Sequence, residues 1–283
     1  MCVRLVVTMI MGLVLRGRVW LIDLCMWTRN GARTLPVVLD RINKVVPENL
    51  VNQRLVVDDG STDDTISIAA SLGWRVVPNN GHGICDGANT ALSYVETDLF
   101  CSFEQDVLVS PLWFNRISRL MSKGAAAACG LRFLPENSFC YNIDSYMLSH
   151  NSGDYGKTLD NTFWDSEVLR SIGGFPKVTN AFTETILHNE LRHLGYRWLV
   201  DYGVRSLHLH GGLRDELRHY RFYGANLVEL NRRLGWRNDV WGKVVRSPVA
   251  ALHMAFSTGD PRLVLSYPLC RLAMLWGYLY GCA

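Results

Sequence analysis

Residues 54–65 read RLVVDDGSTDDT. The apolar run at 55–57 favours a buried strand, and it stops at two adjacent carboxylates, Asp58 and Asp59. A glycine then allows a tight turn, and the hydroxyl and carboxylate side chains that follow suit the N-terminus of a helix over 65–72. The sequence therefore predicts acids at the carboxyl end of a strand, the edge where open α/β sheets bind ligands.

An Asx-capped turn would account for the later acids, Asp63 and Asp64, but it gives the adjacent pair Asp58 and Asp59 no role. A carboxylate at such an edge accepts hydrogen bonds from a base or a ribose hydroxyl. We therefore interpret the pair as part of a nucleotide-binding site.

Strand-like and helix-like segments alternate over the first half of the chain. The sequence predicts strands over 20–27, 54–58, 74–77, 99–103 and 125–133, separated by helices over 35–46, 65–72, 88–95 and 111–121. This alternation implies an α/β fold with a mostly parallel, doubly wound, Rossmann-like sheet. Further along, we expect helices over 163–172 and 184–194 and strands over 197–200 and 204–210, whereas 134–162 shows no clear period.

Polar clusters follow three of the predicted strands. They are Thr28-Arg29-Asn30, Asp58-Asp59 and Glu104-Gln105-Asp106. Because the strands of a parallel sheet all point the same way, we expect these clusters to converge on one edge. Thr28, Asn30 and the two aspartates are accordingly candidate nucleotide ligands.

The third cluster also suits a metal ion. In an extended chain, positions i and i+2 point to the same side, so Glu104 and Asp106 can both face one divalent cation. Hard oxygen ligands suit Mg²⁺ or Mn²⁺, which typically bridge a protein to a diphosphate. The alternative is a pair of acids at a solvated helix N-terminus.

Residues 79–89, NNGHGICDGAN, are rich in glycine. Their spacing is G-x-G-x-x-x-G, and they follow the third predicted strand, so they do not match the dinucleotide-binding fingerprint. A loop whose glycines let the backbone approach a sugar nucleotide remains a reasonable interpretation, with Gly83 and Asn89 as candidate contacts.

Composition limits the classes of protein that fit. An apolar fraction of 48% with 19% charged residues describes a globular chain, and a net charge of +3 is too small to indicate nucleic acid. The eight cysteines form no C-x-x-C pair, which argues against a cysteine zinc site. They read as small buried side chains in a reducing compartment, so we expect a cytoplasmic protein, at the inner face of the membrane if the tail binds lipid.

Two terminal segments lie outside the expected domain at 19–235. Residues 1–18 hold an eleven-residue apolar run, far short of the ~20 residues that span a bilayer, and no signal cleavage site follows. We expect a poorly ordered extension there, with an added edge strand as the alternative.

The tail, 236–283, contains a nearly apolar stretch from 263 to 280 that Pro268 interrupts. One helical face of this stretch carries Leu269, Leu272, Ala273, Trp276 and Tyr280. Aromatic rings on such a face, with arginines nearby, favour peripheral contact with a membrane surface. A helix packed on the core or a dimer contact would give the same pattern.

Several of these motifs together carry a resemblance. WTRNGARTLPVVLDRI (27–42), VVDDGSTDDT (56–65), SFEQD (102–106), GGFP (173–176) and TETILHNELRHLGYRW (183–198) are similar to the inverting family-2 glycosyltransferases of GT-A fold, over about residues 20–235. The resemblance implies a nucleotide-sugar donor, a divalent metal held by a D-x-D-type motif and an acidic general base from a later E-D pair. It also implies transfer with inversion to an acceptor hydroxyl, on a glycan or a lipid-linked acceptor.

The chain departs from the family pattern at two places. The D-x-D position is Glu104-Gln105-Asp106, so Asp106 is the safer metal ligand and Glu104 the substitute. The E-D position falls on Thr183-Glu184, which puts Glu184 in the place of the catalytic Asp. Its extra methylene changes its reach and leaves its chemistry as a base intact. A helix N-terminal acid is the structural alternative.

Three further residues are candidates, two histidines through the same resemblance and one arginine through the basic composition of its segment. A histidine after the last core strand can complete the metal shell in similar enzymes, and His208 and His210 occupy that place in LHLHGG. The basic stretch at 213–224 includes Arg218, which would bind diphosphate oxygens unless it simply lies on a solvated helix face.

Two rival functions stay open. A nucleotidyltransferase that makes sugar nucleotides would need a glycine-rich phosphate loop after the first strand, which residues 27–36 lack. A non-catalytic relative that binds a nucleotide sugar or carbohydrate is suggested by the two departures.

Overall fold

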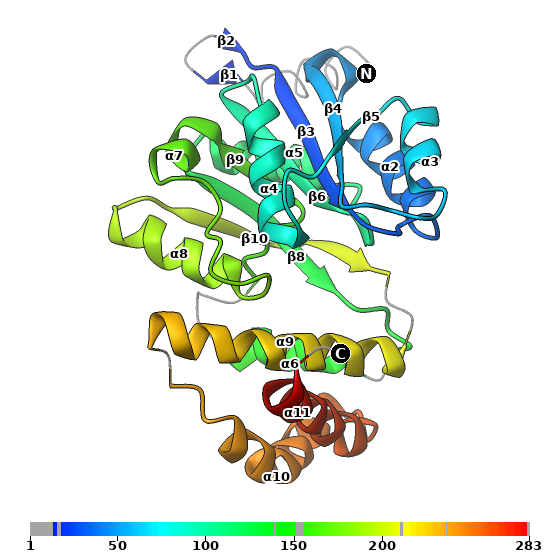
Figure 1. Cartoon of the computed structure of the whole chain (residues 1–283), viewed down its shortest axis with the longest axis vertical. Coiled ribbons are helices and arrows are strands. Elements are labelled where there is room, and N and C mark those ends of the chain that lie inside the picture. The colour runs from blue at the N-terminus through cyan, green and yellow to red at the C-terminus, as the bar shows by residue number, and fades with distance from the viewer. Residues whose placement is uncertain are drawn as a thin grey trace. The chain divides into compact units, whose positions relative to one another are not determined.

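The computed structural model describes residues 14–15, 18–138, 140–150, 156–209, 212–235 and 237–281 (Figure 1). The chain forms two compact units. The first comprises residues 1–132, 156–177 and 183–207, and the second comprises 133–155, 178–182 and 208–283.

The first unit is built on an eight-stranded sheet with the strand order β5-β4-β3-β6-β9-β8-β10-β7. The strands are β3 (Ile22–Thr28), β4 (Val51–Asp58), β5 (Arg75–Pro78), β6 (Leu99–Glu104), β7 (Val107–Leu108), β8 (Ala127–Phe133), β9 (Thr162–Asp165) and β10 (Trp198–His208). Strands β5, β4, β3 and β6 run parallel, whereas β9 pairs antiparallel with both β6 and β8. The expected mostly parallel α/β sheet is confirmed.

Helices cover both faces of this sheet, as a doubly wound fold requires. They are α2 (Leu35–Val45), α3 (Thr65–Ser71), α4 (Gly83–Tyr94), α5 (Trp113–Met121), α7 (Ser166–Ser171) and α8 (Thr183–His193), with a 3₁₀ turn, η2 (Glu48–Leu50). On one face, residues of α4, α7 and α8 share a core cluster with Trp27 and Val57. On the other face, the ring of Trp113 from α5 stacks on Phe163 at 5.2 Å.

One predicted helix is wrong in its first half. Residues 162–165 form β9, and only the following six residues are helical. Phe163 and Trp164 are fully buried on opposite faces of the sheet, and Asp165 caps α7 by accepting a hydrogen bond from the backbone N–H of Val168 at 3.0 Å. Burial of two large aromatic side chains outweighs the helical spacing that the sequence suggested.

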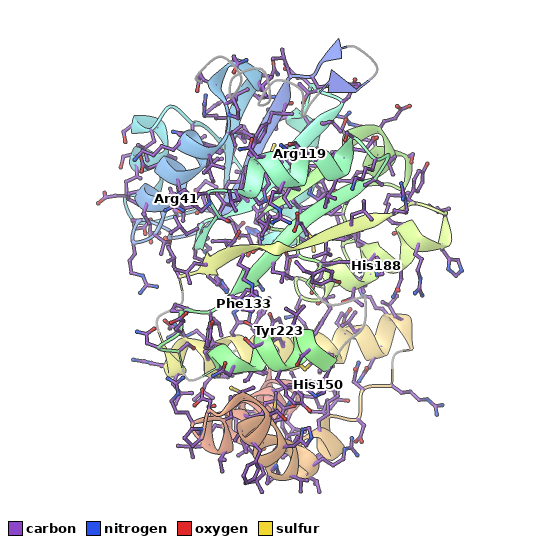
Figure 2. The ribbon with its side chains drawn as sticks, turned by 180° about the vertical axis from the view of Figure 1, so that it is seen from behind. Arg41, Arg119, Phe133, His150, His188 and Tyr223 are labelled. Carbon is purple, nitrogen blue, oxygen red and sulfur yellow. The ribbon has the colours of Figure 1, made fainter. Side chains whose placement is uncertain are left out.

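Two other segments also differ from expectation. The two strands expected over 197–210 are one continuous strand, β10. The ring of His188 on α8, which Figure 2 labels, lies 6.5 Å from that of Trp198 at the start of this strand. Helix α4 begins at Gly83, five residues before its expected start, because the glycine-rich segment itself is helical from that point.

The second unit consists of helices within the described residues. They are α6 (Tyr141–His150), α9 (Leu213–Leu234), α10 (Val240–Thr258) and α11 (Leu263–Tyr280). Helices α9 and α11 cross closely at two glycines: a Cβ on Gly224 would lie 1.8 Å from the carbonyl oxygen of Met274, and one on Gly277 would lie 1.9 Å from that of Arg221. Only glycine permits this approach of the two backbones.

The terminal expectations are only partly open to inspection. Most of residues 1–18 lie outside the described residues, although β1 (Val14–Leu15) pairs antiparallel with β2 (Arg18–Val19). The six described cysteines are buried, as expected, and form no disulfide with one another; the sulfur atoms of Cys140 and Cys270 lie 3.6 Å apart. Across the described ranges, no helix has the length and apolarity to cross a membrane.

Candidate active site

Four parallel strands end side by side at the predicted edge. In the register of the sheet, Thr28 is opposite Asp58, and Trp27 is opposite Glu104. The backbone N–H of Asp59 donates to the carbonyl of Thr28 at 2.9 Å, which extends the pairing beyond the last strand residue. The expected convergence of the polar clusters at 28–30, 58–59 and 104–106 therefore follows from the pairing.

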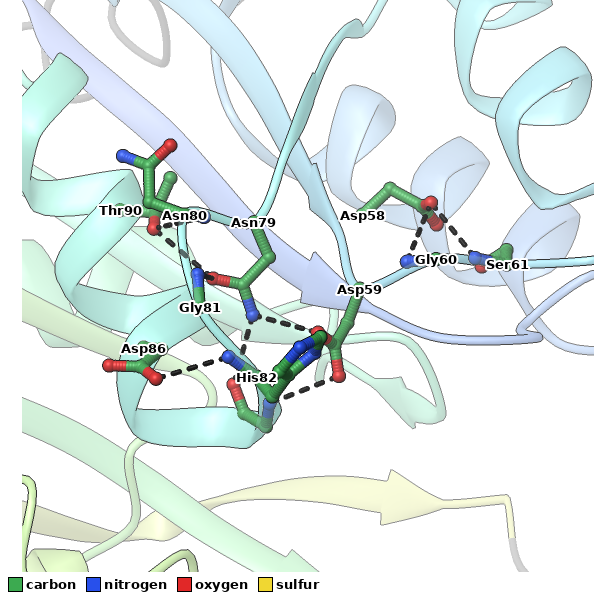
Figure 3. Close-up of polar contacts among 11 residues, drawn as sticks. Asp58, Asp59, Gly60, Ser61, Asn79, Asn80, Gly81, His82, Asp86 and Thr90 are labelled. Atoms are coloured by element: carbon green, nitrogen blue, oxygen red, sulfur yellow. Dashed lines mark hydrogen bonds and ion pairs between the residues drawn. The ribbon is translucent and has the colours of Figure 1, made fainter.

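Asp58 is buried and shapes the turn after β4 (Figure 3). Its Oδ2 accepts hydrogen bonds from the backbone N–H groups of Gly60 at 3.1 Å and Ser61 at 2.9 Å. Its Oδ1 is also buried and has no hydrogen-bond partner among the described residues. Since a buried oxygen without a partner is costly, Oδ1 is suited to accept a hydrogen bond from a ligand.

Asp59 joins the end of β4 to the start of α4. Its Oδ1 accepts a hydrogen bond from the side-chain amide of Asn79 at 3.0 Å, and its Oδ2 accepts one from the backbone N–H of Gly83 at 3.0 Å (Figure 3). The ring Nδ1 of His82 lies 3.6 Å from Oδ1. Gly83, predicted as a backbone contact for the donor, thus gives its N–H to a protein carboxylate, and it has a left-handed φ of 81°.

The glycine-rich loop is closed on itself. The Oδ1 of Asn79 accepts hydrogen bonds from the backbone N–H of Gly81 and from the Thr90 hydroxyl, both at 3.2 Å. A Cβ on Gly81 would lie 2.2 Å from the Oδ2 of Asp86. The glycines therefore make a tight connection between β5 and α4, which the spacing alone did not reveal.

Asn89 has a structural role that the sequence did not predict. Its side-chain amide donates to the carbonyl of Phe175 at 2.8 Å and its Oδ1 accepts from the N–H of the same residue at 2.9 Å. The amide also donates to the carbonyl of Cys85 at 2.8 Å. Both ends of the side chain hold the GGFP turn against α4, and the contact of Asn89 with a ligand stays a prediction.

Gln105, the middle residue of E-Q-D, fixes the end of β3. Its Oε1 accepts hydrogen bonds from the Thr28 hydroxyl and from the backbone N–H of Arg29, the latter at 2.9 Å. Its amide donates back to the carbonyl of Arg29 at 3.2 Å. The Asn30 Oδ1 accepts from the backbone N–H of Thr62 at 2.8 Å. Thr28 and Asn30 therefore stand at the predicted edge with their side chains tied to neighbouring loops.

An acidic cluster lies beyond β6. Arg132 Nη1 is 3.1 Å from the Oδ2 of Asp160 and 3.5 Å from the Oε2 of Glu104. Asp160 is fully buried, and its Oδ1 has no hydrogen-bond partner within the described ranges. Burial, reinforced by the charge of Asp160, raises the pKa of Glu104 to about 8, and the charges of Asp106 and Glu184 act in the same direction.

We name these four carboxylates, Glu104, Asp106, Asp160 and Glu184, the acidic cluster. The repulsion among these carboxylates favours a proton on Glu104, and for the same reason it favours a cation bound beside them. Asp160 and Arg132 were missed by sequence reasoning because neither belongs to a strand end of the parallel part of the sheet.

Glu184 is the second residue of α8. Burial is the main cause that raises its pKa above the ordinary value, and Asp160 adds to the effect, whereas Arg132 opposes it. The preceding Thr183 is buried, and its hydroxyl lies 3.1 Å from the sulfur of Cys85 on α4. This contact anchors the start of α8 within the first unit and so fixes the backbone that carries Glu184.

The remaining candidates belong to the second unit or lie outside the described residues. His208 is buried, with its ring 6.3 Å from that of His219. His210 lies outside the described residues. Arg218 is exposed on α9 and pairs with Asp215 at 3.2 Å. Within the described part of the chain, no three His, Cys, Asp or Glu side chains are gathered so as to hold a metal by themselves.

Comparison with known proteins gives one family match. The family model described as glycosyl transferase family 2 matches residues 23–168. A search of curated protein sequences found no match to this chain.

Solved structures show where the fold recurs. The mannosyltransferase PcManGT from Pyrobaculum calidifontis, in complex with GDP-Man and Mn²⁺, is 16% identical, with 92% of this chain and 87% of that chain covered at a TM-score of 0.67. Glucosyl-3-phosphoglycerate synthase from Mycobacterium tuberculosis, in complex with Mn²⁺, UDP and glucosyl-3-phosphoglycerate, is 18% identical, with coverages of 78% and 82% and a TM-score of 0.57. The structure of the same enzyme with Mg²⁺ and UDP is 17% identical, with 78% of this chain and 81% of that chain covered at a TM-score of 0.58. These likenesses establish the expected GT-A-type fold.

Proposed function

Because this chain belongs to glycosyl transferase family 2, we propose that it transfers a sugar from a nucleotide diphosphate donor to an acceptor hydroxyl, with inversion at the anomeric carbon. The observation that carries the proposal is the acidic cluster, Glu104, Asp106, Asp160 and Glu184, at the end of β6. In the sheet, β3 lies between this strand and β4, which ends at Asp58. The solved structures of similar fold contain GDP-Man or UDP together with Mn²⁺ or Mg²⁺.

The nucleotide would bind at the ends of β3 and β4. The buried Oδ1 of Asp58 is suited to accept a hydrogen bond from the base or ribose. The side chains of Thr28, Asn30 and Asp59 are engaged by the protein, so they would shape this part of the site and offer the donor their remaining lone pairs and backbone groups. Arg218 remains a proposed contact for the diphosphate.

The donor set fits a divalent metal. Asp106 and Glu104 offer the hard carboxylate oxygens that Mg²⁺ and Mn²⁺ prefer, and the excess of carboxylates over cations in the acidic cluster favours a positive ion. When bound, the metal would neutralise charge on the diphosphate leaving group. Diphosphate oxygens, with His208 or His210 as further proposed ligands, would complete the shell.

Glu184 is the proposed general base. Its carboxylate would take the proton from the acceptor hydroxyl while the hydroxyl oxygen attacks the anomeric carbon and the bond to the diphosphate breaks on the opposite face. The raised pKa suits the role, since a stronger base accepts the proton more readily near neutral pH. For the acceptor we propose a glycan hydroxyl or a lipid-linked acceptor, and the apolar helices of the second unit support the lipid-linked class.

The test compares Glu184→Gln with Glu167→Gln, an exposed glutamate on α7. Thermal unfolding against UDP-, GDP- and dTDP-sugars, with Mn²⁺, Mg²⁺ or chelator, identifies the donor, because a ligand at 100 times its Kd adds roughly 2.7 kcal/mol of stability. Glu184→Gln should retain the donor-dependent shift and lose transfer, whereas Glu167→Gln retains both.

Other outcomes would contradict the proposal in distinct ways. Loss of donor binding in Glu184→Gln would mark that residue as structural. Release of pyrophosphate from a nucleoside triphosphate would identify a nucleotidyltransferase. Binding of a donor without turnover on any acceptor would indicate the non-catalytic relative, which the substitutions at Glu104 and Glu184 also suggest.

A further inference from the structure

Helix α10 exposes a continuous row of large apolar side chains. Trp241, Val245, Val249, Leu252 and Phe256 recur every three or four residues, so they lie on one face of the helix. We name this row the outer face of α10. The side chain of Phe256 is 87% exposed and that of Val245 is 74% exposed. Single exposed apolar residues are ordinary, but a row along about four turns of one helix marks an interaction surface.

The opposite face of the same helix already supplies its packing. Val240, Ala251 and Met254 are buried, and Met254 belongs to the apolar cluster that includes Leu263 and Cys270. The ring of His253 on α10 lies 5.7 Å from that of Tyr146 on α6. His150, which Figure 2 labels, is also on α6 and stacks on Tyr146 at 4.0 Å. The fold therefore buries the face of α10 opposite to its outer face, and the apolar side chains of the outer face are left exposed.

Helix α11 repeats the pattern. Leu265, Leu272, Trp276, Leu279 and Tyr280 are exposed, and the side opposite them holds buried Cys270 and Met274. The sequence alone pointed to this helix as a membrane-contact candidate. The structure adds the outer face of α10, which Phe256 and Val245 make the more exposed of the two.

The charges on these helices are of one sign. Residues 240–258 and 263–280 contain Lys243, Arg246 and Arg271 and no aspartate or glutamate. Asp239, the N-cap of α10, pairs with Arg246 at 3.0 Å. Arg246 precedes Val249 by three residues, so a cation flanks the apolar row on the helix surface.

We propose that the outer face of α10 lies on an anionic lipid surface, with its apolar side chains inserted at the headgroup boundary and with Arg246, at the edge of this face, beside the lipid phosphates. Basic residues next to an apolar and aromatic face are the pattern of helices that lie in the plane of a membrane.

Self-association is the alternative that the charges disfavour. In a symmetric dimer the same patch meets itself, so the Arg246 side chains of the two copies would both lie near the interface. Anionic headgroups instead complement these cations, and each Lys or Arg near such a surface contributes about 1 kcal/mol, or about fivefold in binding.

The test is flotation of the full chain with vesicles of phosphatidylcholine, with or without phosphatidylglycerol. We expect binding that requires phosphatidylglycerol and weakens as salt rises. Phe256→Ser should reduce binding by about tenfold or more, because a buried aromatic side chain contributes about 2 kcal/mol. Arg246→Gln should reduce it by about fivefold.

Matched controls make the test specific. Val37→Ser on α2 and Ile66→Ser on α3 remove exposed apolar side chains from the first unit and should leave vesicle binding unchanged. All the substituted side chains are exposed, so the melting temperature should stay within about 2 °C of the parent, as for surface substitutions that change stability by less than about 0.5 kcal/mol.

Three results would overturn the proposal. They are equal binding of parent and Phe256→Ser, binding that ignores phosphatidylglycerol, and absence of flotation together with a dimer that Phe256→Ser dissociates. The assay uses no donor or acceptor. Its failure therefore leaves the proposed transferase function unaffected, and loss of transferase activity would leave the vesicle result intact.

Discussion

The Oδ2 of Asp59 accepts the backbone N–H of Gly83 at 3.0 Å. This bond joins the acid that follows β4 to the first residue of α4, 24 positions later in the chain. An acid that sequence reasoning assigned to the nucleotide alone therefore also holds two segments of the candidate site together. Its contribution to binding and its contribution to stability should be separable.

Asp59→Asn is expected to lower both stability and donor binding. Asparagine keeps one acceptor oxygen, so its amide must face either the N–H of Gly83 or the amide of Asn79. Asn79 cannot turn to compensate, because its two ends are held by the loop. An unsatisfied group of this kind costs about 1–3 kcal/mol, measurable as a lower urea midpoint.

The control for this substitution is Asp64→Asn, an exposed acid at the start of α3 whose side chain makes no capping hydrogen bond. It should leave the urea midpoint nearly unchanged. A stable Asp59→Asn variant that nevertheless loses donor binding would show that Asp59 acts on the ligand directly.

Asn89→Ala separates a structural amide from a ligand contact. The substitution removes the bonds to both backbone groups of Phe175, so we expect a loss of about 2–3 kcal/mol in the free energy of unfolding. The Kd for the donor, corrected for the fraction of protein that is folded, should stay within about twofold of the parent value. Loss of a ligand contact worth about 1.4 kcal/mol would instead change it about tenfold. Asn80→Ala, at an exposed position of the same loop, is the matched control. A variant of unchanged stability with weakened donor binding would restore Asn89 as a ligand residue.

The sequence was most informative where local pattern and sheet direction act together. Apolar runs that end at Thr28, Asp58 and Glu104 predict parallel strands, and parallel strands bring their ends to one edge. The same reasoning could not find Asp160 and Arg132, because their position depends on β9 running antiparallel between β6 and β8.

Side-chain use was harder to predict than position. Gln105 holds the end of β3 through Thr28 and Arg29, residues 76 or 77 positions away, and no local pattern encodes such a bond. Asn89 is a similar case. A polar residue at a strand end or helix start can serve a ligand or the adjoining loop, and only the tertiary structure distinguishes the two.

Metal removal should affect donor binding through Asp106. Chelator is expected to abolish the donor-dependent rise in melting temperature, and Mn²⁺ or Mg²⁺ should restore it. Asp106→Asn should raise the metal concentration that gives half of this shift by at least tenfold, since one carboxylate ligand and its charge are lost. Asp98→Asn, at an exposed position before β6, should behave as the parent. A donor-dependent shift that persists in chelator would contradict a metal-bridged diphosphate.

Asp260 should make the second unit sensitive to acid. Its carboxylate accepts hydrogen bonds from Arg262 and from the Asn142 amide, at 2.8 Å and 3.0 Å, and these contacts, Arg262 first, lower its pKa from 3.8 to about 2. Since the folded-state pKa lies below the unfolded one, the stabilisation is fully present above about pH 4 and is lost as the pH falls through about 2. After a discount for the partly exposed Arg262, it amounts to about 1–2 kcal/mol.

Asp260→Asn should therefore unfold at lower urea than the parent at neutral pH, and the difference should shrink as the pH approaches about 2. Arg262→Gln should lower stability at neutral pH for the same reason. The double variant should lose less stability than the sum of the losses in the two single variants, because both substitutions remove the same interaction. A difference between parent and Asp260→Asn that stays constant from neutral pH into acid would show that the side chain contributes through packing and hydrogen-bond geometry alone. The charge of Asp260 would then have no part in holding the turn between α10 and α11.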